Sequence, residues 1–329
     1  MNVFLTGITG LLGNEIANQF LEKGYTIRAL VRDPARAVNR HPGITYVEGD
    51  ILDVVSLTEQ LRGADYVVHA AAVVSFAPRD RNIMYKTNVE GTANIVNACL
   101  GASVKKLCYI SSIAAFGRPS FKEMKKADRV EIDENQKWVN SETNSHYAIT
   151  KYQGECEVWR GAAEGLKTVI VNPSIILGGG DWNQSSTRLF KYVYDEKPFY
   201  PEGYLNYVDV MDVAAAVVQL TESGITDERY CLSAGVISYR EFFTKIAARF
   251  GKKKPWLKVS AGLMGVIWRF EALKSALTGG APLITKETAR TAQLKIIQKN
   301  HKIREALGFE FRPLEETLGR VCAFLTGKR

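Results

Sequence analysis

The first half of the chain alternates between short apolar segments and longer amphipathic ones, and this alternation restricts the fold more than any other feature. Strand-like apolar segments cover residues 2–7, 25–32, 44–50, 64–72, 104–112 and 167–174. Between them, apolar residues recur at helical spacing over 11–24, 54–62, 87–101 and 145–164. Alternating strands and helices predict an α/β fold with a doubly wound parallel sheet, whose ligands bind at the carboxyl ends of the strands.

The sequence changes character after Pro173. The segment 174–190, SIILGGGDWNQSSTRLF, is rich in glycine and polar residues and is predicted to be a loop over the carboxyl edge of the sheet. Strand and helix patterns return over 204–223, and the remainder, 236–329, is predicted to be mainly helical. The chain therefore has a sheet-forming part followed by a segment of different construction.

These patterns predict two domains. The first is a sheet domain of residues 1–173, to which 207–235 return, and the second is a smaller, mainly helical substrate lobe of 174–206 and 236–329. The lobe contains the aromatic side chains expected to cover an apolar substrate: Trp182, Phe199, Tyr200, Tyr204, Trp256 and Trp268. Its apolar segment 259–270 is short, so we expect a core or pocket-lining helix, with contact to a membrane surface as the alternative.

Composition excludes several classes of protein. No apolar stretch reaches the roughly 18 residues of a membrane span, and no signal sequence precedes the strand at Asn2, so we expect a cytoplasmic protein without stable membrane insertion. The five cysteines are scattered without zinc-site spacing, which indicates a reducing compartment and no metal. The net charge of +8 comes from charges mixed along the chain, which favours a small-molecule substrate over a nucleic acid.

A glycine-rich turn joins the first strand to the first helix. TGITGLLG places Gly7, Gly10 and Gly13 there. At this point of a doubly wound sheet, glycines let the backbone approach a pyrophosphate, and the helix N-terminus supplies free N–H groups and a positive dipole. The turn predicts dinucleotide binding by a Rossmann sheet, and a merely tight turn is the alternative.

The end of the second strand indicates which dinucleotide binds. Sheets that bind NAD usually place Asp or Glu here to accept hydrogen bonds from the adenosine ribose. This strand ends Val31-Arg32 instead, and arginine pairs with phosphate in a bidentate geometry. NADP(H) is therefore favoured. NAD(H) stays the alternative, because Asp33 follows and Arg32 could be a solvated strand end.

A tyrosine and a lysine lie four residues apart in SHYAITKYQ, at Tyr147 and Lys151. One helical turn places both side chains on the same helix face. In a chain with 14 tyrosines, about one such pair is expected by chance. The spacing alone therefore identifies no site, and the surrounding motifs have to decide.

Further motifs follow in order along nearly the whole chain: GDILD (49–53), HAAA (69–72), TNVEGT (87–92), YISS (109–112), YAITK (147–151), NPS (172–174) and YVDVMDVA (207–214). With the glycine-rich turn in front, the chain resembles the extended short-chain dehydrogenase/reductase family, of the NAD-dependent epimerase/dehydratase type. VRDP (31–34) and NPSIILGGG (172–180) look most similar to its dihydroflavonol reductase and 3β-hydroxysteroid dehydrogenase branch.

The resemblance implies roles for the residues that match. Ser112, Tyr147 and Lys151 would form the catalytic triad, with Ser112 preferred to Ser111 because it stands four residues before Phe116-Gly117, where the family usually has Tyr-Gly. Phe116 lacks that hydroxyl, which bears on substrate choice. The cofactor would be bound by Thr6, Gly7, Thr9, Gly10, Leu11, Leu12, Gly13, Arg32, Asp50, Ile51, Ala70, Ala71, Ala72, Asn88, Ile110, Ser111, Tyr147, Lys151, Asn172, Pro173 and Ser174.

These residue types suit hydride transfer between a nicotinamide cofactor and a carbonyl or alcohol. Tyr147 would protonate the oxygen that becomes an alkoxide, and Lys151 is expected to lower the pKa of Tyr147 from its usual value near 10. Ser112 would donate a hydrogen bond to the same oxygen. The expected function is an NADPH-dependent oxidoreductase acting on a small, fairly apolar substrate.

Two alternatives remain at this stage. A nucleotide-sugar epimerase or dehydratase with retained NAD would use the same triad, although NPSIILGGG lacks the NVYGP form typical of those members. A non-catalytic sensor or scaffold commonly loses the tyrosine or the lysine, and both are present here. By resemblance, a homodimer formed through the helices at 87–101 and 145–164 is expected.

Overall fold

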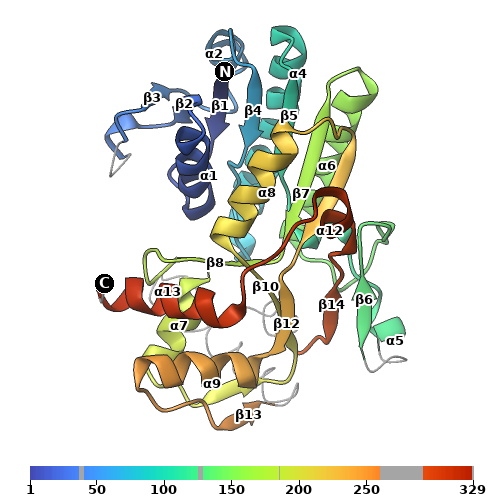
Figure 1. Cartoon of the computed structure of the whole chain (residues 1–329). Helices are drawn as coiled ribbons and strands as arrows, with labels where there is room; N and C mark the ends of the chain where they lie inside the picture. The colour runs from blue at the N-terminus through green and yellow to red at the C-terminus, as the bar shows by residue number, and fades with distance from the viewer. Residues whose placement is uncertain (37–40, 125–128, 185, 260–291, 328–329) are drawn as a thin grey trace.

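A seven-stranded parallel sheet lies at the centre of the computed structural model, which describes residues 1–36, 41–124, 129–184, 186–259 and 292–327. Its strand order is β3-β2-β1-β4-β5-β7-β11 (Figure 1). The strands are β1 (Asn2–Thr6), β2 (Thr26–Val31), β3 (Ile44–Glu48), β4 (Tyr66–His69), β5 (Lys106–Ile110), β7 (Thr168–Pro173) and β11 (Glu228–Leu232). The predicted doubly wound parallel sheet is confirmed, because every neighbouring pair is parallel.

Helices cover both faces of this sheet. One face packs against α1 (Leu11–Glu22), α8 (Val210–Glu222) and α12 (His301–Leu307). The other face packs against α2 (Val54–Gln60), α4 (Gly91–Ala102) and α6 (His146–Ala163). The strands carry apolar side chains on both sides, as buried parallel sheets require. Strand order reverses between β1 and β4, so the carboxyl ends of these strands form the crevice where such sheets bind ligands.

Smaller elements lie beyond the carboxyl edge of the main sheet (Figure 1). Among the described residues, three short sheets are found here. One consists of β8 (Ile175–Leu177), β10 (Tyr204–Asp209) and β12 (Gly235–Ser238), the second of β9 (Phe199–Pro201) and β13 (Leu257–Val259), and the third of β6 (Val130–Ile132) and β14 (Ile296–Gln298). Longer helices here are α7 (Thr187–Tyr194), α9 (Tyr239–Phe250) and α13 (Leu314–Thr326). Short helical turns are η1 (Pro34–Arg36), η2 (Pro78–Asp80), α3 (Arg81–Tyr85), η3 (Lys86–Glu90, a π-helical turn), η4 (Ile113–Phe116) and α5 (Phe121–Met124).

The prediction of a loop over 174–190 is wrong at both ends. Residues 175–177 form β8, which pairs in parallel with β10, and Leu177 is fully buried. Residues from Thr187 onward begin α7, whose Phe190 is buried against Phe242. The sequence pattern did not indicate β8 and α7, because glycine and polar residues lie between these two short elements. Their apolar side chains are buried only by tertiary contacts.

Part of the stretch 207–235 joins the main sheet. α8 packs on α1, and β11 is the seventh strand, whereas β10 pairs with β8 and β12 in a small sheet. Of the aromatics expected to cover a substrate, Trp182 instead packs beside Tyr194 and Phe250 within the apolar core of the smaller elements. Trp268 and residues 260–270 lie outside the described residues. Among the described residues, no helix has the length and apolar character to cross a membrane.

Two ion pairs fasten the C-terminal segment to the start of α8. The carboxylate of Asp209 is fully buried and accepts from Arg320 Nη2 on α13 at 2.6 and 2.5 Å. The carboxylate of Asp212 accepts from the backbone N–H of Arg312 at 2.8 Å and pairs with the guanidinium of the same residue. Both acids belong to YVDVMDVA, so this motif joins α13 to the sheet-forming part.

Removing the buried charge of Asp209 should lower the stability of the fold. In Asp209→Asn, Arg320 loses its charged partner at a half-exposed position, and we expect the free energy of unfolding to fall by about 2 kcal/mol. Urea denaturation measures this. The matched control is Asp195→Asn, which removes an exposed pair with Lys191 on α7 and should change stability by about 0.5 kcal/mol or less. Equal losses in the two variants would contradict the anchoring role.

Candidate active site

The glycine-rich turn packs tightly against the end of β4. Gly7 has a φ of +81°, and a Cβ there would lie 2.6 Å from the carbonyl carbon of Ala70. A Cβ on Gly13 would lie 2.1 Å from the carbonyl oxygen of Gly7. Gly10 is the N-cap of α1 and provides no side-chain cap, so the N-terminal N–H groups of this helix lack the usual side-chain acceptor. Such a turn suits an anion at the helix N-terminus.

The remaining residues of the turn differ in exposure. Thr9 and Gly10 are exposed, whereas Leu11 and Leu12 are half-buried. Thr6 is buried, and its hydroxyl contacts His69 Nδ1 at 2.7 Å and accepts from the N–H of Ala71 at 3.1 Å. Thr6 therefore holds β4 beside the turn, and Ala72 follows as an exposed residue.

His69 is a neutral member of a buried network. Its Nε2 lies 3.1 Å from the hydroxyl of Thr92, which itself donates to the carbonyl oxygen of Asn88 at 2.8 Å. Because that hydroxyl has one proton, Nε2 is assigned as the donor and Nδ1 as the acceptor of the Thr6 proton. Burial, with the nearby charge of Lys151, lowers the pKa of His69 to about 3.

The adenosine end of the predicted cofactor cleft contains Arg32, which is exposed after the end of β2. The carboxylate of Asp33 accepts from the backbone N–H of Ala35 at 2.9 Å, so it is engaged in its own turn. Asp50 similarly accepts from the N–H of Leu52 at 3.0 Å, and Ile51 is buried beside α4.

Asn88 is buried, and its amide ties two segments together. Its Oδ1 accepts from the N–H of Val73 at 2.8 Å, and its Nδ2 donates to the carbonyl oxygen of Val73 at 2.9 Å. The same Nδ2 donates to the hydroxyl of Thr150 on α6 at 3.1 Å. In this arrangement Asn88 fixes the chain after β4 against the helix that carries Tyr147. Its predicted contact with the cofactor stays a prediction.

Ser112 and Tyr147 meet at the carboxyl edge of the sheet. Ser112 follows β5 in extended conformation, and its hydroxyl accepts from the N–H of Ala114 at 3.2 Å. Tyr147 stands in the first turn of α6, which is capped by Ser145. α6 packs against η4, the turn that Ser112 caps, and the Ser112 side chain acts to lower the pKa of Tyr147. The packing of α6 against the end of β5 therefore brings together two residues that lie far apart in the sequence.

Lys151 lies one turn further along α6 and is almost completely buried. Its Nζ donates to the hydroxyl of Tyr109 and to the carbonyl oxygen of Ile110, each at 2.8 Å. Burial lowers the pKa of Lys151 to about 7, although the charge of Glu155 opposes this. Ile110 thus reaches the site through its backbone oxygen.

The expected lowering of the tyrosine pKa is not found. Burial raises the pKa of Tyr147 to about 12, and the nearby Ser112 side chain only partly opposes this. Lys151 is directed to Tyr109 and Ile110 rather than to the phenol. Desolvation outweighs the neighbouring cation here because the amine is itself buried and easily loses its charge. At neutral pH Tyr147 therefore keeps its proton.

The end of β7 presents two buried acceptors without a partner among the described residues. These are Oδ1 of Asn172, which is fully buried, and the hydroxyl oxygen of Ser174. Asn172 Nδ2 donates to the carbonyl oxygen of Ser112 at 2.9 Å, and Pro173 ends the strand between them. Orphaned acceptors of this kind fit a ligand with N–H donors, such as a nicotinamide carboxamide. The residues present therefore fit a nicotinamide cofactor, both at the glycine-rich turn and at the end of β7.

Comparison with known proteins identifies the family. The family model described as the NAD dependent epimerase/dehydratase family matches residues 3–232. The chain belongs to this family. It is an NAD(P)-dependent oxidoreductase of the extended short-chain dehydrogenase/reductase type.

Relatives of this family member include proteins named as reductases. A Synechocystis protein named for dihydroflavonol 4-reductase is 29% identical over 96% of this chain and 92% of that protein. Cinnamoyl-CoA reductase 1 of Petunia hybrida is 30% identical over 77% of this chain and 78% of that enzyme. The crystal structure of gox2253 has a TM-score of 0.82 at 28% identity, and covers 99% of this chain and 98% of that one. UDP-glucose 4-epimerase of Thermotoga maritima, at 21% identity, shares the fold with a TM-score of 0.79.

Several side chains at the site were missed by the sequence analysis. Glu155 lies two turns after Tyr147 and contacts Ser111, and Tyr109 receives the amine of Lys151. The spacing of Glu155 in YAITKYQGE was a signal, because positions four apart share a helix face. The sequence could not indicate the contact of Arg229 on β11 with Glu155, because this contact depends on the order of the strands in the sheet.

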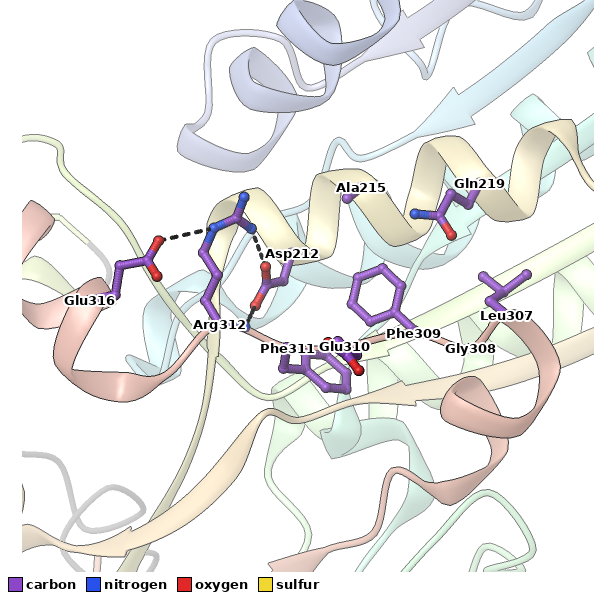
Figure 2. A pocket seen from close by; sticks show the side chains of 10 residues that line it. All are labelled: Asp212, Ala215, Gln219, Leu307, Gly308, Phe309, Glu310, Phe311, Arg312 and Glu316. Atoms are coloured by element: carbon purple, nitrogen blue, oxygen red, sulfur yellow. Dashed lines mark hydrogen bonds and ion pairs between the residues drawn. The ribbon is translucent and has the colours of Figure 1, made fainter.

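A separate cleft of 580 Å³ lies outside this family site. It is lined by α8, residues 307–312 and Glu316, and Figure 2 shows Arg312 between Asp212 and Glu316 at one end. Asp212 and Glu316 are both paired with Arg312. Among the described residues, no group of three or more His, Cys, Asp and Glu could hold a metal ion.

The buried amine of Lys151 predicts a pH-dependent stability. Its pKa is about 7 in the folded chain and 10.5 when unperturbed, so the unfolded chain binds more protons between these values. The free energy of unfolding from this group therefore rises with pH, by about 1.4 kcal/mol per unit. Lys151→Met should remove that slope in urea denaturation at several pH values. Lys191→Met, which changes a solvent-accessible lysine, should keep it, and an unchanged slope in Lys151→Met would refute the burial of a largely neutral amine.

Proposed function

We propose that this chain is an NADPH-dependent reductase that converts a carbonyl group of a small, fairly apolar substrate to an alcohol. The observation that carries the proposal is that α6, which bears Tyr147 in its first turn, packs against η4, the turn that Ser112 caps. The amide of Asn172, whose Oδ1 has no partner among the described residues, donates to the carbonyl oxygen of Ser112, and Asn88 donates to Thr150 on α6. These contacts support a site in which a proton donor and a second hydroxyl act together.

The proposed mechanism assigns one task to each side chain. NADPH, when bound, supplies the hydride. Ser112 donates a hydrogen bond to the carbonyl oxygen and orients it, and Tyr147 gives its proton to the same oxygen as negative charge develops. The raised pKa of Tyr147 keeps the phenol protonated at neutral pH, which is the form that reduction needs. The ammonium form of Lys151, one turn along α6, would offset the charge left on the phenolate.

The preference for NADPH rests on Arg32. Its exposed guanidinium is available to a 2′-phosphate, and Asp33 is engaged with the N–H of Ala35. A carboxylate free to accept from the ribose would instead favour NAD.

The apolar character of the substrate is supported by the chain that follows β4. Val74 and Phe76 are exposed apolar side chains of this segment. The ring of Phe76 meets that of Tyr147 edge-on, with centroids 6.2 Å apart. An exposed phenyl ring beside the proton donor suits an apolar or aromatic substrate group.

A panel of aldehydes, ketones and alcohols, followed by NADPH and NADH absorbance with purified protein, tests this function. Reduction of apolar carbonyl compounds with NADPH is the expected result. Tightly bound NAD after purification, with no net oxidation or reduction, would instead favour an epimerase or dehydratase. The predicted homodimer and cytoplasmic location stay predictions, which light scattering and cell fractionation test.

Tyr147→Phe should remove the proton donor without removing the cofactor. We expect kcat to fall by about a thousandfold, while the Kd for NADPH in a protein fluorescence titration stays within about twofold. Tyr152→Phe is the control, because Tyr152 is on the same helix but stacks on Trp138 at 4.3 Å. Unchanged turnover in Tyr147→Phe would disprove the assigned role.

Arg32→Ala should weaken NADPH specifically. Loss of a charge-assisted contact with the 2′-phosphate is expected to raise the Kd for NADPH by about tenfold or more and leave the Kd for NADH nearly unchanged. Arg28→Ala is the control, since Arg28 lies on β2, which Arg32 follows, and donates to the carbonyl oxygens of Gln60 and Arg62. Equal effects on both cofactors in Arg32→Ala would overturn the NADPH assignment.

A further inference from the structure

A buried carboxylate lies beneath the proposed catalytic residues. Glu155 on α6 is 1% exposed. Its Oε1 accepts from the hydroxyl of Ser111 and from Nδ2 of Asn172, each at 2.5 Å, and its Oε2 accepts from Arg229 at 3.2 Å. Glu155 therefore joins α6 to the carboxyl ends of β5 and β7 and to β11. The mechanism described above does not use this group.

Glu155 shares a helix face with Tyr147, the proposed proton donor, and Lys151, the buried amine. Tyr147, Lys151 and Glu155 are spaced four residues apart, so their side chains follow one another along the side of α6 that meets the sheet. The direct acceptors of Lys151, Tyr109 on β5 and the Ile110 carbonyl, are neutral groups. The charge of Glu155 acts to raise the pKa of Lys151 and so favours its ammonium form, while burial raises the pKa of Glu155 itself.

The other titratable groups around Lys151 act differently. His69 on β4 is held neutral by burial, and burial raises the pKa of Tyr109 on β5. Tyr147, one turn before Lys151, also keeps its proton. Arg229 on β11 is cationic, and its salt bridge with Glu155 offsets part of the carboxylate charge.

Glu155 also fixes the amide of Asn172. The Nδ2 of Asn172 donates to Glu155 and to the carbonyl oxygen of Ser112. With both N–H groups engaged, the amide cannot flip, and its unpartnered Oδ1 stays on the opposite side. The orientation of Asn172 therefore depends on Glu155, and the backbone that carries Ser112 depends on Asn172.

We propose that Glu155 is a positioning residue of this active site: it supplies the negative charge beside Lys151 and, through Asn172, holds the backbone of Ser112. The catalytic consequence rests on the proposed function, whereas the effect on Lys151 does not. Glu155→Gln removes the charge with little change in shape. Glu155→Asp keeps the charge and shortens the side chain, which separates the electrostatic effect from the contacts.

The titration of Lys151 tests the electrostatic part directly. NMR of protein labelled at lysine follows its side-chain signal against pH, and Lys151→Met identifies that signal. We expect Glu155→Gln to move the titration midpoint of Lys151 to lower pH by about one unit or more, and Glu155→Asp to leave it close to that of the wild type. An unchanged midpoint in Glu155→Gln would overturn the proposal, whether or not the chain is a reductase.

A second variant removes the remaining ambiguity. In Glu155→Gln, Arg229 is left without its carboxylate, and its charge alone could act on Lys151 or unfold the chain. The double variant Glu155→Gln with Arg229→Met removes both charges, so its midpoint should stay below that of the wild type. Recovery of the wild-type midpoint in the double variant would assign the effect to Arg229 and overturn the proposal.

The pH dependence of turnover tests the catalytic consequence. The assay uses a carbonyl compound from the panel that the chain reduces. We expect the alkaline limb of the kcat profile of Glu155→Gln to move to lower pH, in parallel with the NMR midpoint of Lys151. The reason is that a neutral amine no longer offsets the charge of the phenolate. If the NMR midpoint of Lys151 moves but the alkaline limb of kcat does not, the proposed effect of Glu155 on catalysis is wrong. If the wild-type chain reduces no carbonyl compound, the proposed function fails, and the NMR result still decides the role of Glu155 toward Lys151.

Discussion

The close approach of α6 to β5 is the constraint on which the arrangement of this site depends. Gly154 makes it possible, because a Cβ there would lie 2.5 Å from the hydroxyl of Tyr109 and 2.7 Å from the carbonyl oxygen of Asn88. At this separation Lys151 reaches both Tyr109 and the Ile110 carbonyl, and Glu155 reaches Ser111. A wider spacing would leave these polar groups buried without partners, which is costly.

Burial explains why the charges of this site differ from those of the same residues in water. A lysine and a glutamate taken out of solvent lose hydration, and hydrogen bonds restore only part of it. The structure therefore favours the less charged forms of Lys151 and Tyr147 and surrounds Glu155 with three donors. A site of this kind responds strongly to any added or removed charge, which is useful where a proton must move.

The sequence predicted the features that arise from local patterns. Strand and helix periodicity predicted the parallel sheet, and the residues of TGITGLLG form the expected tight turn. The spacing of Tyr147 and Lys151 placed both on α6. β8 and α7 were missed because their apolar residues are flanked by glycine and polar residues and gain stability from β10 and α9. The pKa of Tyr147 was predicted in the wrong direction, because burial depends on neighbours from several strands rather than on one residue four positions away.

The C-terminal segment shows how the variable part of the chain is tied to the cofactor side. Gly178 leaves room for Leu11 at the start of α1, since a Cβ there would lie 2.9 Å from the Leu11 side chain. At Gly179 a Cβ would lie 2.5 Å from the ring of Phe324 on α13. The glycine run thus lies between the N-terminus of α1 and the C-terminal helix. Asp209 and Arg320 hold that helix to α8. The C-terminal helix, the glycine run and the start of α1 are therefore one continuous set of packed elements.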